Sequence, residues 1–141
     1  MKLPEDRITH SSAETEMLGE ELSRLLGNGD VVGFIGDLGT GKTTMIKGIA
    51  RGLGIDPNEV SSPSFALIHE YIGRFAVHHI DLYRIERPSE VAELGLWEIF
   101  DDGISLVEWA DRALELLPKN ALVVRIERIA PAERRIEFGR K

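Results

Sequence analysis

The string GDLGTGKT, which begins at Gly36, has a spacing of glycine, lysine and threonine that suits phosphate binding. It fills every fixed position of the pattern GxxxxGK[ST]. Glycine at Gly36, Gly39 and Gly41 lets successive backbone N–H groups approach phosphate oxygens that side chains would otherwise block. Lys42 is placed to neutralise β- and γ-phosphates, and the Thr43 hydroxyl is placed to ligate the Mg²⁺ ion that bridges them. The sequence therefore predicts a nucleotide-binding loop.

The local context supports this prediction. An apolar run typical of a buried strand, VVGFI, comes directly before the loop, and a helical pattern of apolar residues follows it. The start of that helix adds its positive end to the phosphate site. The alternative is a glycine-rich turn whose lysine is merely solvated. The residues of the loop that we assign to nucleotide contacts are Gly36, Asp37, Leu38, Gly39, Thr40, Gly41, Lys42, Thr43 and Thr44.

A metal ion at such a loop needs a carboxylate from the end of a neighbouring strand. Two apolar runs end in an acid: ISLVE ends at Glu108, and FAVHHID ends at Asp81. We assign both acids to the catalytic site together with Lys42, and we place Glu108 nearer the metal because its strand is the more apolar. The metal ligands predicted from the chain are thus Thr43 and Glu108. For each acid the alternative is an ordinary exposed residue at a strand end.

The sequence favours ATP over GTP. GTPases recognise guanine through a late Asn-Lys-x-Asp segment, whereas here Lys119-Asn120 is followed by Ala-Leu. A kinase of similar size would need a lid that carries arginine and excludes water, and the candidates for it are Arg84 and Arg87. A kinase therefore stays open as an alternative.

Composition narrows the class of protein further. The chain has 141 residues with a net charge of −7 and no cysteine. The acidic balance argues against a dominant basic face for nucleic acid, and the missing cysteines exclude disulfides and thiolate metal sites. No segment has the apolar length of a membrane span or of a signal peptide, so we expect a soluble, cytoplasmic protein that forms one domain over residues 1–141.

Several elements must position these residues. A capping box at Ser11 and Glu14 predicts a helix that ends near the Gly-Asn-Gly at position 27, with Met17 in its apolar stripe. Further helices are expected over 42–53, 90–94 and 110–117. Strands are expected over 7–9, 31–35, 65–71, 75–81, 104–107, 121–129 and 134–138, with hairpins joining 65–71 to 75–81 and 121–129 to 134–138.

The remaining polar residues give weaker indications. The four histidines do not have metal-ligand spacing, because adjacent His78 and His79 would point to opposite faces of a strand, so we expect no zinc site. Trp97 and Trp109 are interpreted as packing residues, although Trp109 follows Glu108 directly and could lie at the mouth of a site. The basic residues near the C-terminus form either a solvated face or a docking patch for a partner or RNA.

With these motifs in hand, the chain resembles the bacterial TsaE (YjeE) family, which comprises small P-loop ATPases needed for threonylcarbamoylation of an adenosine in certain tRNAs. The resemblance covers nearly the whole chain. It is carried by GDLGTGKTT, by the segments SPSF from Ser62 with Tyr71 downstream, HIDLYR from His79 and VEW ending at Trp109, and by ET and LG in the first helix. Two positions depart from the family pattern: Ser64 replaces its usual Thr, and Ala110 replaces the Pro that often follows Glu-Trp.

The resemblance implies a fold, a set of roles and partners. The fold is α/β: a P-loop NTPase-like sheet of mixed parallel and antiparallel strands flanked by helices. Thr43 and Glu108 would hold Mg²⁺, Asp81 would support the metal or the attacking water, residues 62–65 would form a switch-like loop, and Arg134 would contact the nucleotide. The implied cofactors are ATP and Mg²⁺. The implied partners are TsaD and TsaB, with tRNA reached indirectly through their complex, and no membrane.

Three functional hypotheses therefore remain open from the sequence. The first is an ATPase of the tRNA-modification machinery that is weak alone, is stimulated by partners, and resets or activates the TsaD–TsaB assembly. The second is a small P-loop kinase. The third is a nucleotide-gated binding module in which hydrolysis is incidental.

Overall fold

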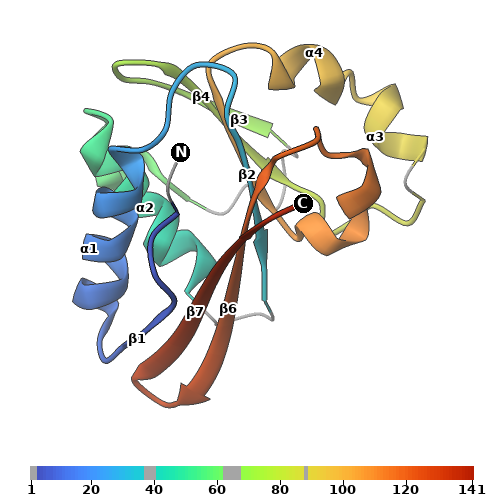
Figure 1. The fold of residues 1–141 in the computed structure, drawn as a ribbon. Coiled ribbons are helices and arrows are strands. Elements are labelled where there is room, and N and C mark those ends of the chain that lie inside the picture. The colour runs from blue at the N-terminus through green and yellow to red at the C-terminus, as the bar shows by residue number, and fades with distance from the viewer. Residues whose placement is uncertain (1–2, 37–40, 62–67, 88) are drawn as a thin grey trace.

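The computed structural model describes residues 3–36, 41–61, 68–87 and 89–141, and Figure 1 shows their arrangement. Their strands form one seven-stranded sheet in the order β1-β7-β6-β2-β5-β4-β3. The strand bounds, in chain order, are β1 (Arg7–Thr9), β2 (Val31–Ile35), β3 (Ile68–Ile72), β4 (Ala76–Asp81), β5 (Ile104–Glu108), β6 (Leu122–Ala130) and β7 (Glu133–Arg140).

The four central strands run parallel, and this direction determines where the predicted site residues meet. β2 pairs in parallel with β5 and β6, and β5 pairs in parallel with β4. The outer strands β1, β7 and β3 pair antiparallel to their neighbours. The carboxyl ends of β2, β4 and β5 consequently lie at one edge of the sheet, which is where open α/β sheets bind ligands. The predicted mixed α/β sheet is confirmed.

Helices cover both faces of the sheet (Figure 1). One face packs against α1 (Ser12–Ser23) and α2 (Lys42–Gly52), and its core includes Val32 and Phe34 of β2. The other face packs against residues that include Leu96 and Phe100 of α4 (Leu96–Phe100), which follows α3 (Ser89–Glu93). Three 3₁₀ turns complete the described elements: η1 (Pro57–Glu59), η2 (Ala110–Arg112) and η3 (Leu114–Leu116).

Glycines allow α1 and α2 to pack against each other at very short range. A Cβ atom added to Gly19 of α1 would lie 2.2 Å from the Met45 carbonyl oxygen, and one added to Gly48 of α2 would lie 1.9 Å from that of Glu16. Backbone atoms of a facing helix cannot move aside as a flexible side chain can. This contact therefore fixes the position of α2, whose first turn follows the predicted phosphate loop.

We expect Gly48→Ala to lower the free energy of unfolding by about 1–3 kcal/mol, because the added methyl group overpacks the helix contact. The loss should appear even though alanine favours helix over glycine by about 1 kcal/mol. Gly27→Ala is the matched control, since its added Cβ would meet nothing within 4 Å. Urea unfolding of both variants measures the difference, and equal stabilities would contradict the close packing.

Most of the predicted elements are present, with three differences. Met17 is 64% exposed, so it does not belong to the buried stripe of α1. The stretch 110–117 forms η2 and η3 in place of one helix, because Ala113 between them has φ −150° and ψ 39°, outside helical values. The short helix α4, which begins after Gly95 in a left-handed conformation, was not predicted. No helix in the described parts of the chain is long and apolar enough to cross a membrane.

Candidate nucleotide site

The loop GDLGTGKT connects β2 to α2 at the carboxyl edge of the sheet. Gly41 immediately precedes α2 and has φ 104°, a backbone conformation that residues other than glycine rarely adopt. Because Gly41 has no side chain, it cannot cap α2 by a side-chain hydrogen bond. The N–H groups of the first turn are therefore suited to bind an external anion. Thr43 and Thr44 are half-buried in this turn. Asp37, Leu38, Gly39 and Thr40 lie outside the described residues, and their assigned contacts stay predictions.

The ammonium group of Lys42 is held between a carbonyl and an aromatic ring. Lys42 is 5% exposed, and its Nζ donates a hydrogen bond to the Gly36 carbonyl oxygen. The same Nζ lies 3.5 Å from the centroid of the Trp109 ring, within range of a cation–π interaction. Trp109 itself has φ 58°, a left-handed backbone that is uncommon for a bulky residue. Trp109 thus lies at the site, as one reading of the sequence allowed, and a cationic group lies beside Gly36 at the end of β2.

The two predicted carboxylates are neighbours in the sheet. Asp81 ends β4 and Glu108 ends β5, and the two residues are paired in register. Both are almost completely buried, with 4% and 3% exposure, so neither is an ordinary exposed strand-end acid. The Tyr83 backbone N–H donates to Asp81 Oδ1 at 2.8 Å. The structure therefore brings together the pair of acids that the sequence assigned to one site.

Burial raises the pKa of the Asp81 carboxyl group. The hydrogen bond from the Tyr83 backbone opposes this rise, the charge of Glu108 adds to it, and the charges of His79 and Lys42 oppose it. Because these charges all act on Asp81, the lysine and the two acids form one electrostatic cluster. A carboxylate with a raised pKa is also a stronger base than an ordinary aspartate.

The raised pKa predicts a pH-dependent effect of Asp81→Asn on the ligand-free protein. The folded state holds the proton on Asp81 more tightly than the unfolded state does, so ionisation of Asp81 costs stability as the pH rises through its folded pKa. The asparagine variant, whose Oδ1 can still accept from Tyr83, should therefore have the higher melting temperature at neutral pH. This advantage should shrink as the pH falls through the raised pKa of folded Asp81 and should be gone below the usual range for aspartate. An equal difference at every pH would contradict the prediction.

Two residues of the site were missed by the sequence analysis. His79 is fully buried, and its Nε2 lies 2.6 Å from Glu108 Oε2. Tyr71 from β3 places its hydroxyl 3.1 Å from His79 Nδ1. From residue spacing the histidines were weighed as zinc ligands, and His79 otherwise entered only through the HIDLYR segment of the family resemblance. The available signal was that His79 lies two residues before Asp81, and hence on the same face of the same strand.

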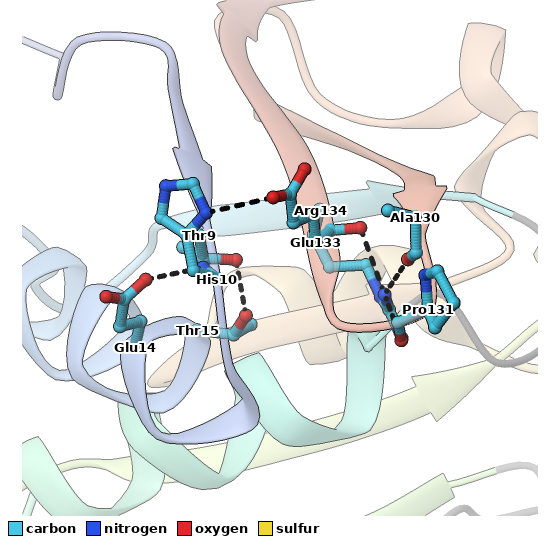
Figure 2. Close-up of polar contacts among 8 residues, drawn as sticks. All are labelled: Thr9, His10, Glu14, Thr15, Ala130, Pro131, Glu133 and Arg134. Carbon is cyan, nitrogen blue, oxygen red and sulfur yellow. Dashed lines mark hydrogen bonds and ion pairs between the residues drawn. The ribbon is translucent and has the colours of Figure 1, made fainter.

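Arg134 of β7 lies beside the start of α2. A Cβ atom built on Gly41 would be 3.8 Å from Arg134 Nε and 3.9 Å from Thr15 Cγ2. Figure 2 shows that the Arg134 guanidinium donates to the carbonyl oxygens of Ala130, Pro131 and Glu133. Nearby, the hydroxyls of Thr9 and Thr15 share a hydrogen bond. The structure thus brings the predicted Arg134 close to the phosphate loop, although it is more than ninety residues away in the chain.

The donors at this edge suit a hard cation that is also held by phosphates. The Thr43 hydroxyl and the Glu108 carboxylate offer oxygen ligands, and Mg²⁺ is commonly bound through one or two carboxylates plus substrate phosphates. Across the described residues, no cluster of three or more His, Cys, Asp or Glu side chains could hold a metal ion without help. The Thr43 and Glu108 oxygens are chemically suited to a magnesium ion.

Comparison with known proteins shows the family to which the chain is similar. Residues 9–136 match the family model described as Threonylcarbamoyl adenosine biosynthesis protein TsaE. The tRNA threonylcarbamoyladenosine biosynthesis protein TsaE of Bacillus subtilis is 43% identical over 132 residues, covering 92% of this chain and 82% of the relative. The protein of the same name from Treponema pallidum is 34% identical over 130 residues, covering 92% and 96%.

A solved structure resembles the fold as well. The crystal structure of Bacillus subtilis YdiB superposes with a TM-score of 0.77 at 36% identity, and the match covers 94% of this chain and 82% of that one. The family match spans the loop, both buried acids and Arg134. On this evidence the chain belongs to the TsaE family, the tRNA threonylcarbamoyladenosine biosynthesis proteins.

Proposed function

We propose that this protein is a Mg²⁺-dependent ATPase of the tRNA threonylcarbamoyladenosine machinery, and that its hydrolysis of ATP resets or activates a TsaD–TsaB transferase assembly in the cytoplasm. Residues 1–141 serve as one nucleotide-binding domain, and tRNA is reached indirectly through the complex. The observation that carries the proposal is the meeting of Lys42, Asp81 and Glu108 at the carboxyl edge of the sheet, beside the glycine-led start of α2.

Each residue has a role that its surroundings support. Lys42 binds the β- and γ-phosphates, and the N–H groups of the first turn of α2 add further donors. Thr43 and Glu108 hold the metal, which when bound draws charge from the phosphates. Asp81 orients the attacking water and can take its proton, for which its raised pKa suits it. The water oxygen forms the new bond to phosphorus, and the bond to the β–γ bridging oxygen breaks to give ADP and phosphate.

The proposed activity depends on partners. The motifs of the chain place no arginine finger over the γ-phosphate, a group that accelerates related hydrolases by about 10³–10⁵-fold. We therefore expect slow hydrolysis by the isolated protein and faster hydrolysis when TsaD and TsaB supply groups or order the site. Steady-state hydrolysis with and without both partners tests the proposal, and unchanged turnover would count against it.

Nucleotide binding should also change the fluorescence of Trp109. The Lys42 ammonium group lies against the Trp109 ring, and phosphates at the loop would draw it away. The chain has two tryptophans, and the other one, Trp97, is 55% exposed on α4. Titration with ATP should change the emission of Trp97→Phe as it does that of the wild type, whereas Trp109→Phe should lose the response while still binding ATP by calorimetry. If Trp97→Phe lost the fluorescence change and Trp109→Phe kept it, the placement of Trp109 beside the bound phosphates would be wrong.

A further inference from the structure

A chain of hydrogen bonds runs through the interior to Glu108. The Tyr71 hydroxyl lies 3.1 Å from His79 Nδ1, and His79 Nε2 lies 2.6 Å from Glu108 Oε2. Tyr71, His79 and Glu108 are all buried, with exposures of 6%, 0% and 3%. The chain lies on the face of the sheet that α1 and α2 cover, since Tyr71 belongs to the core on that side.

With an ionised Glu108 and a neutral His79, the donors and acceptors in this chain have one consistent order. An ionised Glu108 accepts only, so the proton of neutral His79 is on Nε2 and Nδ1 is left as an acceptor. Tyr71 must then donate its single proton to Nδ1. If His79 carried a proton on both nitrogens, Nδ1 could no longer accept the hydrogen bond from the buried Tyr71 hydroxyl. Tyr71 therefore selects the tautomer of His79 that can donate to Glu108.

We propose that Tyr71 and His79 are positioning residues that orient Glu108 toward the metal of the Mg²⁺–nucleotide complex. The proposal rests on the function proposed above. His79 binds Oε2 and fixes the carboxylate, so that Oε1 is turned to the metal or to a water bound to it. Partners of this kind determine the orientation of a ligand, and their loss commonly costs 10–100-fold in metal affinity.

The arrangement also explains why a fully buried imidazole is present at this place. Glu108 is the register neighbour of Asp81, and the charge of Glu108 raises the pKa of Asp81, so the two acids repel each other when both are ionised. The donor on His79 compensates Glu108 for lost solvation and holds it in one conformation. An apolar residue at position 79 would fill the same space without providing that donor.

The adjacent histidine provides a matched control. His78 is also buried, at 6% exposure, and its Nε2 lies 2.9 Å from Asp102 Oδ2. It faces the opposite side of the sheet from His79 and pairs in register with Glu70 of β3. A replacement at His78 thus removes a buried histidine and its acid contact without touching Glu108.

The test measures the affinity of Mn²⁺, used in place of Mg²⁺, for the protein–ADP complex by electron paramagnetic resonance. ADP affinity in the presence of a chelator is measured in parallel. We expect His79→Leu to weaken Mn²⁺ binding by about 10–100-fold and Tyr71→Phe by about 10-fold, with metal-free ADP affinity unchanged. His79→Gln, whose amide can donate to Glu108, should recover most of the loss, and His78→Leu should match the wild type.

A second readout follows the tautomer directly. Nitrogen-15 NMR of the metal-free protein should show the wild-type His79 protonated on Nε2, and Tyr71→Phe should shift the population toward Nδ1. Folded Tyr71→Phe protein with wild-type Mn²⁺ affinity would overturn the proposal, as would a wild-type His79 protonated on Nδ1. Failure of the wild type to bind Mn²⁺ with ADP would instead overturn the proposed function, and this inference with it. If His79→Leu does not fold, Tyr71→Phe decides.

Discussion

Lys42→Ala should abolish measurable ATP hydrolysis, with a loss of at least about 100-fold in kcat/KM. Lys42 is the buried cation of the site, held by the Gly36 carbonyl and the Trp109 ring at the edge where the phosphates are expected. Removing the Lys42 ammonium group leaves the negative charge of the bound phosphates without its main counter-charge at a buried site. Phosphate release in the presence of TsaD and TsaB measures the effect, and calorimetry measures the accompanying loss of ATP affinity.

Lys47→Ala is the control for this variant. Lys47 lies on the same helix but is only half-buried, beyond the first turn that faces the loop. It should keep wild-type hydrolysis. If Lys42→Ala hydrolysed ATP as fast as Lys47→Ala, the phosphate site would have to lie elsewhere in the protein.

Glu108→Gln should lower metal-dependent hydrolysis by about 100-fold or more while changing ATP affinity by less than about 3-fold. The substitution is nearly isosteric and removes the charge that holds the metal, whereas the first turn of α2 and Lys42 still bind the phosphates. Glu98→Gln, at an exposed position of α4, is the control and should behave as the wild type. An equal loss of binding and hydrolysis in Glu108→Gln would show that Glu108 has another role.

The same variant separates the ATPase from the nucleotide-gated module. If Glu108→Gln binds ATP and its partners but no longer supports threonylcarbamoylation, hydrolysis itself is needed. If it still supports the modification, ATP acts by binding alone. A kinase would be recognised differently, because labelled γ-phosphate would appear on an acceptor and not only as free phosphate.

Local patterns in the sequence predicted the framework of the site. The apolar run over β2, the glycines after it and the helical spacing over α2 each act over a few residues, so the elements on both sides of the loop could be located. Glu108 and Asp81 were found because a phosphate-binding loop needs a carboxylate from the end of a neighbouring strand, and two apolar runs end in an acid. What the pattern could not show was that these two acids are direct neighbours in register.

The contacts that complete the site depend on pairing between distant strands. His79 reaches Glu108 only because β4 and β5 lie side by side, and Tyr71 reaches His79 through the hairpin of β3 and β4. A buried histidine beside a carboxylate looks the same in sequence as any histidine in a strand. Arg134 was expected from the family resemblance and not from its surroundings, because its approach to Gly41 requires β7 to return to the start of α2.

The proposed function requires this site to hydrolyse ATP when it acts on the TsaD–TsaB assembly. The most direct measurement is steady-state ATP hydrolysis with Mg²⁺, titrated with purified TsaD and TsaB, using Lys42→Ala as the blank. We expect slow turnover of the protein alone and strong stimulation by the two partners together, with both lost in the Lys42→Ala blank. Turnover that stays unchanged, with nucleotide binding and active partner preparations both demonstrated, would contradict it.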